Sequence, residues 1–158
     1  MWLSTVLELM DWKGEFYIGE TWLVYRGRAA DNRPHAHATL QLTVSLGPDI
    51  SISDQSEQVI SGAALCVKAG KRHTLHPSDK AVLVLIEPQS QLARYVQSFA
   101  GDDDVSRVDP NLIAQVNWEG ELGTLLDSLD LDFGDVGSQM DLRLMEALKF
   151  LRTAQLNG

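Results

Sequence analysis

The stretch at residues 34–46, PHAHATLQLTVSL, decides the fold because polar and apolar side chains alternate along it. Successive side chains of an extended strand point to opposite faces, so residues two apart share a face. The alternation therefore predicts a β-strand that carries the first two histidines on one side. The polar face carries His35, His37, Thr39, Gln41, Thr43 and Ser45, and the apolar face carries Leu40, Leu42, Val44 and Leu46.

Short β-rich runs recur around this stretch, with glycine, proline, asparagine and aspartate between them. Branched and aromatic residues favour strands, and many short strands without helices between them indicate an antiparallel sandwich or barrel. The expected fold class is mainly β with C-terminal helices. The strand-like runs are residues 21–26, 39–46, 49–53, 63–68 and 81–87.

After Pro88 the pattern becomes helical. Ser90 is a candidate N-cap, and Asp109 followed by Pro110 predicts the start of a short helix. Further on, four leucines recur with helical spacing. The expected organisation is a sensor barrel at residues 1–88, a helical dimerisation segment at 89–129, an acidic linker at 130–138, and the first helix of a truncated DNA-binding domain at 139–158.

Composition narrows the possible functions. The 158-residue chain has a formal net charge of −9, which opposes binding to the phosphates of nucleic acid, because that binding needs clustered lysine and arginine. No apolar run is long enough to span a membrane, and the acidic first residues are unlike a secretory signal. The single cysteine agrees with a reducing compartment. We expect a cytoplasmic protein that does not bind DNA through these residues alone.

Three histidines form the candidate site. His73 follows a turn at Gly70 and opens another extended run, so it can join His35 and His37. Imidazole is the commonest protein ligand for metals, and three imidazoles can hold Zn²⁺. If the polar face of residues 34–46 points inward, the histidines line a site with or without metal. If it points outward, they have no ligand role. Trp22 and Tyr25, on a predicted strand, are further candidates for the ligand pocket.

The order of these parts resembles the N-terminal effector-binding and dimerisation half of AraC-type transcription regulators. The resemblance rests on residues 35–42 (HAHATLQL), 69–75 (AGKRHTL), 84–88 (VLIEP) and 140–151 (MDLRLMEALKFL). It implies a cupin-type double-stranded β-helix barrel, or jelly roll. It also implies a small-molecule effector, a homodimer, and DNA binding only through a missing helix-turn-helix region.

The cupin metal motif is similar to H-x-H-x₃₋₄-E followed later by G-x-x-H. The chain matches it at His35, His37 and His73 but carries Gln41 at the carboxylate position. An amide brings no negative charge, so a weaker metal site is expected. The alternative function is a stand-alone metal-dependent cupin enzyme of dioxygenase or isomerase type. No catalytic residue is assigned, and catalysis is not expected.

The leucines at helical spacing are the candidate dimer contact. Burying one leucine is worth roughly 1.5–3 kcal/mol, so a stripe of them needs a cover. Either a second copy provides it through a self-complementary contact, or the stripe packs within its own chain. The stripe consists of Leu122, Leu125, Leu126 and Leu129.

Overall fold

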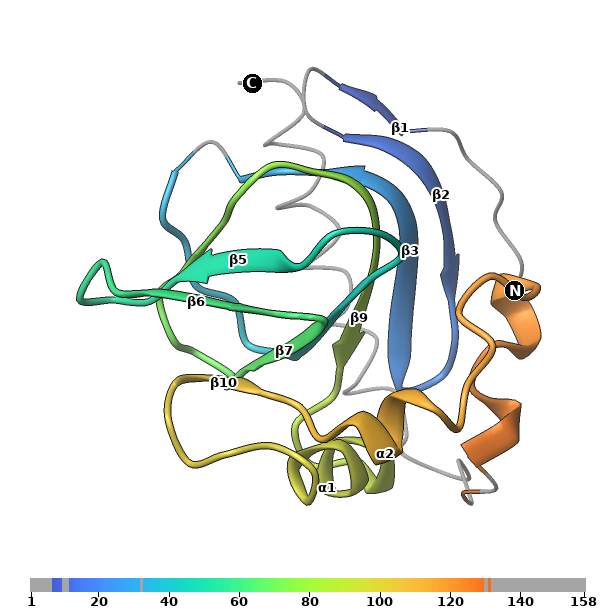
Figure 1. The fold of residues 1–158 in the computed structure, drawn as a ribbon. Coiled ribbons are helices and arrows are strands. Elements are labelled where there is room, and N and C mark those ends of the chain that lie inside the picture. The colour runs from blue at the N-terminus through green and yellow to red at the C-terminus, as the bar shows by residue number, and fades with distance from the viewer. Residues whose placement is uncertain (1–6, 10–11, 32, 130, 132–158) are drawn as a thin grey trace.

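Two antiparallel sheets make up most of the computed structural model, which describes residues 7–9, 12–31, 33–129 and 131 (Figure 1). The larger sheet has seven strands in the order β1-β2-β3-β9-β4-β7-β10. Its strands are β1 (Leu7–Leu9), β2 (Trp12–Ile18), β3 (Trp22–Ala29), β4 (Leu40–Ser45), β7 (Ala64–Val67), β9 (Ser78–Ile86) and β10 (Val105–Arg107).

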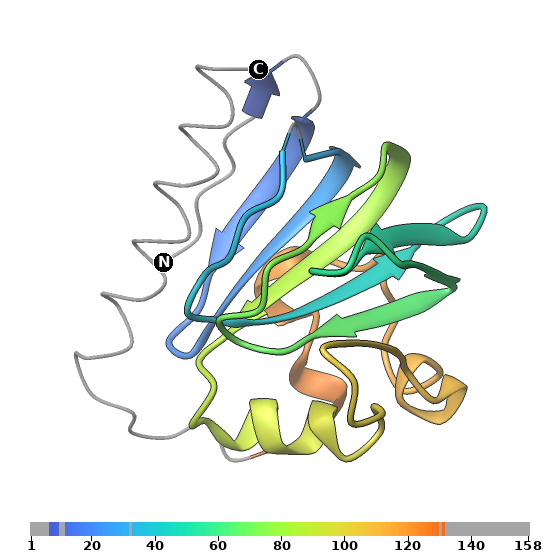
Figure 2. The ribbon, with the colours of Figure 1, turned by 90° about the vertical axis from the view of Figure 1, so that its left-hand side faces the viewer.

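The smaller sheet has three strands in the order β6-β5-β8 and faces the larger one (Figure 2). Its strands are β5 (Ile50–Ser53), β6 (Val59–Gly62) and β8 (Thr74–Leu75). The mainly β, antiparallel fold is therefore confirmed, and each of the five predicted runs contains the core of an observed strand. Strand β8 lies in the extended run predicted after His73, whereas β1, β2, β6 and β10 were not predicted, because they are short or lack a clean alternation.

The register of β4 shows which of its faces points inward. Gln41 lies opposite Leu85 on β9, and Thr43 lies opposite Leu83. Both leucines belong to the apolar core between the two sheets. Partners in register share a face, so the polar side of β4 points into the barrel. Its leucines pack on the outer side of the larger sheet, against the segment that follows Pro88.

Two short helices cover part of that outer side, α1 (Gln91–Gln97) and α2 (Pro110–Ile113) (Figure 2). The hydroxyl of Ser90 accepts a hydrogen bond from the backbone N–H of Ala93 at 3.1 Å. The carboxylate of Asp109 accepts one from the backbone N–H of Asn111 at 2.8 Å. Both predicted helix starts are confirmed, because these side chains satisfy N–H groups that the first turn leaves free.

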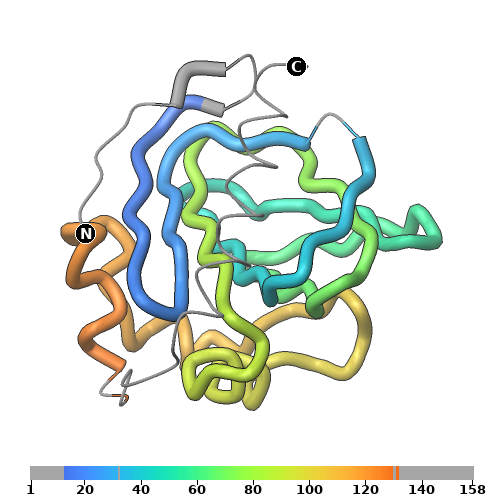
Figure 3. The backbone as a smooth tube through the Cα atoms, turned by 180° about the vertical axis from the view of Figure 1, so that it is seen from behind, coloured from blue at the N-terminus to red at the C-terminus, as the bar shows by residue number. Residues whose placement is uncertain are grey.

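The structure corrects the helix predicted for the leucine stripe. Residues 122–129 do not form one amphipathic α-helix but two 3₁₀ turns, η1 (Leu122–Thr124) and η2 (Asp127–Leu129). Glycine disfavours helix, and Gly123 lies inside the first turn. Figure 3 shows this orange segment beside strand β2. All four candidate dimer leucines are buried in the outer core of their own chain: Leu122, Leu125, Leu126 and Leu129.

The leucine stripe therefore packs within its own chain, which is the second of the two alternatives. It packs against the outer side of the larger sheet, which removes the reason for assigning a dimer contact to these residues. A homodimer stays a prediction without an assigned contact.

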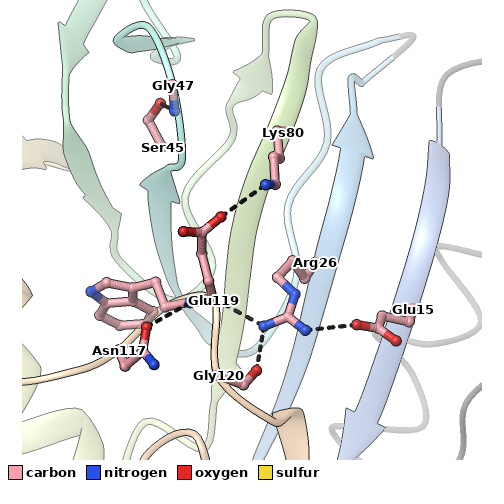
Figure 4. A network of polar contacts seen from close by, with 9 residues as sticks. Glu15, Arg26, Ser45, Gly47, Lys80, Asn117, Glu119 and Gly120 are labelled. Carbon is pink, nitrogen blue, oxygen red and sulfur yellow. Dashed lines mark hydrogen bonds and ion pairs between the residues drawn. The ribbon is translucent and has the colours of Figure 1, made fainter.

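Polar contacts hold the end of the described chain against the sheet (Figure 4). The guanidinium of Arg26 on β3 donates to the backbone carbonyls of Trp118 and Gly120 and forms an ion pair with Glu15 on β2 at 2.7 Å. Lys80 on β9 pairs with Glu119 at 2.9 Å. Strand β10, from the segment expected to be helical, pairs with β7. Residues 89–129 therefore pack as part of the β unit.

The expected linker and last helix lie outside the described residues, except for Leu131. Among the described helices, none combines the length and the apolar character needed to cross a membrane.

Candidate metal centre

The backbone brings the two histidine-bearing segments side by side. His35 and His73 form an antiparallel β-bridge in which each backbone N–H donates to the other residue's carbonyl at 2.9 Å. The turn before His73 contains Gly70 at a φ of +76°, a conformation that glycine adopts without strain. The backbone N–H of Gly70 donates to the carbonyl of His37 at 2.8 Å. One ring nitrogen from each of His35, His37 and His73 lies within 4.8 Å of the others.

Backbone carbonyls define which nitrogen of each ring carries the proton. The Nδ1 atoms of His35, His37 and His73 lie 3.4, 3.2 and 2.9 Å from the carbonyl oxygens of Arg33, Thr39 and Lys71. A carbonyl oxygen can only accept, so Nδ1 is the donor in each contact. With the proton on Nδ1, the Nε2 lone pair of each ring is the one that can bind a metal. This arrangement is typical of histidines that bind metal through Nε2.

Gln41 lies against two of these lone pairs. Its Oε1 is 3.0 Å from Nε2 of His37 and 3.3 Å from Nε2 of His73, while its Nε2 donates to the Thr43 hydroxyl at 2.9 Å. In this orientation, with the ring protons on Nδ1, three acceptor atoms face one another, and a cation between them would satisfy all three. Three imidazole nitrogens and an amide oxygen are suitable ligands for a divalent transition metal.

A second amide orientation satisfies the same atoms without metal. The amide has nearly the same shape when its oxygen and nitrogen are exchanged. Its two N–H groups then donate to the Nε2 atoms of His37 and His73, and the Thr43 hydroxyl donates to the carbonyl. A metal site and a metal-free polar pocket therefore use the same side chains. The alternative of histidines without a role is disfavoured, because their rings converge inside the fold.

Burial keeps the imidazoles neutral. Exposed fractions are 8% for His35, 1% for His73 and 2% for Gln41. Desolvation, with a smaller contribution from the neighbouring histidines, lowers the pKa of His35 to about 3 and that of His73 to about 4. Desolvation also lowers the pKa of His37. Neutral imidazole is the form that binds metal, so protons do not compete for the site at neutral pH.

The structure adds Asp31, which was not among the predicted site residues. Its Oδ2 lies 3.5 Å from Nδ1 of His35, and both side chains are buried. Desolvation raises the pKa of Asp31 to about 7, although a hydrogen bond from the backbone N–H of Leu75 opposes this shift. Burial thus opposes the charged form of each partner, and a divalent ion bound beside His35 would act against this effect on Asp31, because it attracts the carboxylate charge. The signal available in the sequence was that His35 lies four residues after Asp31. This spacing indicates a contact only when the backbone conformation between the two residues is known.

The two aromatic candidates differ in position. Trp22 is wrong as a pocket residue, because it lies on the outer side of the larger sheet, 5.4 Å from Tyr17 between ring centroids. Trp22 and Tyr25 are three residues apart on one strand, so they point to opposite faces. Tyr25 is buried on the inner side, and its hydroxyl donates to the backbone carbonyl of Arg28.

No known protein family and no curated protein matches the sequence. Among solved structures, the chain is similar to AerE from Microcystis aeruginosa at 12% identity and a TM-score of 0.43, over 59% of this chain and 46% of that one. It is similar to a cupin protein from Bacteroides fragilis at 13% identity and a TM-score of 0.40, over 56% of this chain and 89% of that one. It is also similar to an RmlC-like cupin protein from Desulfovibrio desulfuricans at 20% identity and a TM-score of 0.35, over 46% of this chain and 76% of that one. These values assign no family, so function is argued from the side chains of the site.

Proposed function

We propose that this chain is a sensor domain whose inner site binds a divalent transition metal ion. The observation that carries the proposal is that one ring nitrogen of each histidine lies within 4.8 Å of the others, with the Gln41 carbonyl oxygen 3.0 and 3.3 Å from Nε2 of His37 and His73. Zinc fits best, because it takes nitrogen and oxygen ligands in a four-coordinate site. His35, His37, His73 and Gln41 would hold it.

The burial of the ligands supports sensing over catalysis. A catalytic zinc keeps one coordination position open for water or substrate. Here Gln41 supplies a fourth donor, and it is buried like His35 and His73, whereas His37 is partly exposed. A bound ion would supply Lewis acidity, but four protein donors would fill the four positions of a tetrahedral zinc site. The stand-alone cupin enzyme is therefore the weaker alternative.

The regulatory role is the further part of this proposal, and it rests on the resemblance to AraC-type regulators. In that role a small-molecule effector, bound inside a cupin-type barrel, favours one arrangement of a cytoplasmic homodimer over another. A ligand shifts such an equilibrium only through its differential affinity for the two arrangements. DNA binding would reside outside this chain, whose charge of −9 opposes it. A gel-shift assay with this chain alone is expected to show no complex.

Metal analysis tests the site directly. The purified chain, incubated with zinc and then desalted, is expected to retain one zinc ion, and His37→Ala is expected to lose it. His76→Ala is the matched control, because His76 contacts Ser53 at 2.6 Å and lies outside the cluster. A native chain that retains no zinc would contradict the metal site and support the metal-free amide network.

A further inference from the structure

Asp31 contacts both segments that carry the clustered histidines. Its Oδ2 lies 3.5 Å from Nδ1 of His35 and accepts a hydrogen bond from the backbone N–H of Leu75 at 2.7 Å. The backbone N–H of Asp31 donates to the carbonyl of Leu75 at 2.9 Å. Leu75 follows His73 by two residues on the same extended run. One buried carboxylate thus links the two halves of the site.

We propose that Asp31 is a positioning residue of the metal centre, holding the His35 ring with Nε2 toward the ion. The inference rests on the proposed metal site and extends it to a residue that does not itself bind the ion. Metal-ligating histidines commonly donate their second ring N–H to a carboxylate, which fixes the ring and strengthens the ligand.

The three histidines differ in how firmly the backbone holds them. The carbonyl contact of His73 is 2.9 Å long, whereas that of His35 is 3.4 Å. His37 has the Thr39 hydroxyl as a second partner for Nδ1 at 2.9 Å. His35 is the ring whose backbone contact is weakest, and it is also the ring that Asp31 contacts. The carboxylate therefore supplies the orientation that the backbone supplies elsewhere.

Charge supports the same role. The four proposed ligands, His35, His37, His73 and Gln41, are all neutral, so a divalent ion would enter a buried site without an anionic ligand. Bound metal makes the ring N–H of its imidazole a better donor, and a carboxylate is the strongest acceptor a side chain provides. Asp31 is placed to accept that hydrogen bond.

The test compares Asp31→Asn with the native chain in zinc affinity, measured by competition with a chromophoric chelator. Asparagine keeps the shape and can still accept from Leu75, but it removes the carboxylate. A 10- to 100-fold loss of zinc affinity is expected, with a small change in the melting temperature of the metal-free protein. Asp109→Asn is the matched control, because Asp109 also accepts from a backbone N–H but caps α2. It is expected to leave zinc affinity unchanged.

Two further measurements separate positioning from a structural role. Cobalt(II) bound in place of zinc should give a visible spectrum that changes in Asp31→Asn, because the His35 ring is no longer held. In the native zinc-loaded protein, proton NMR should place the Nδ1–H resonance of His35 further downfield than those of His37 and His73, because a carboxylate is a stronger acceptor than a carbonyl; a resonance no further downfield than theirs would overturn the inference. That measurement needs no variant, so it decides the question even if the substitution prevents folding.

The possible failures are distinguishable. If the native chain binds zinc and Asp31→Asn binds it equally well with the same cobalt spectrum, Asp31 has no positioning role while the metal site stands. If the native chain binds neither ion, the metal site and the role of Asp31 are both wrong.

Discussion

Replacing Gln41 with glutamate gives the sharpest test of the site. Glutamate has nearly the same shape, so one carboxylate oxygen takes the position of Oε1, 3.0 and 3.3 Å from the two imidazole Nε2 atoms. The other oxygen can accept a hydrogen bond from the Thr43 hydroxyl, to which the amide nitrogen donates at 2.9 Å in the native chain. The only large change is a negative charge at a position that is 2% exposed.

Without metal, that charge should destabilise the fold. An uncompensated buried charge costs several kcal/mol, and partial neutralisation by a proton reduces the cost to about 2 kcal/mol. A change of 1 kcal/mol shifts the melting temperature of a domain this size by roughly 2–4 °C. The metal-free variant should therefore melt about 4–8 °C below the native chain.

Zinc should stabilise the Gln41→Glu variant more than it stabilises the native chain. At a zinc concentration of about 100 times the native dissociation constant, binding stabilises the native chain by about 2.7 kcal/mol. A variant that binds tenfold more tightly gains about 4.1 kcal/mol under the same conditions. The zinc-dependent rise in melting temperature should thus be about one and a half times the native rise.

Differential scanning calorimetry with zinc and with a chelator measures both effects. Gln97→Glu is the control, because it makes the same change of charge at an exposed position on α1, and it should alter neither quantity. If Gln41→Glu shows the native zinc response, Gln41 is not a ligand. If its metal-free form has the same melting temperature as the metal-free native chain, the Gln41 amide does not face a closed cluster, and the geometry argued above is wrong.

Three other predictions follow from buried groups. Leu125→Asp should unfold the chain, as measured by circular dichroism, because Leu125 is buried in the outer core and a buried charge costs several kcal/mol. A variant that stays folded and sediments more slowly than the native chain would instead support a dimer contact at Leu125. Burial raises the pKa of the Cys66 thiol to about 12, so a thiol reagent at pH 8 should react only after unfolding, and fast labelling of native protein would contradict this. Burial also raises the pKa of Tyr25 above its ordinary value of 10.0. Its contribution to stability is therefore complete below pH 10 and lost as the pH rises above it, so absorbance should show Tyr25 ionising only with alkaline unfolding, not before.

The sequence determined the local features of this protein. Alternation along residues 40–45 and the β-rich runs around it predicted strands, because a strand's period of two is a local property. Ser90 and Asp109 predicted helix starts for the same reason, since a cap bonds to N–H groups two or three residues away. The histidine pair and the glycine turn before His73 identified the residues of the site. The prediction that the strand at residues 40–45 also carries His35 and His37 was wrong, because β4 begins at Leu40 and His35 forms only an isolated bridge with His73.

Only the tertiary structure decided what these local features face. Alternation places Gln41 and Leu42 on opposite sides of a strand, but it does not say which side becomes the interior. That depended on the segment after Pro88, which covers the leucine side and leaves the histidine side between the sheets. The same packing buries the leucine stripe, for which helical spacing left a second copy and the chain itself as alternative partners. It also brings the Asp31 carboxylate into contact with His35 and with Leu75, which lies 44 residues further along the chain. Periodicity is a property of neighbouring residues, whereas burial depends on which distant segment packs against each face.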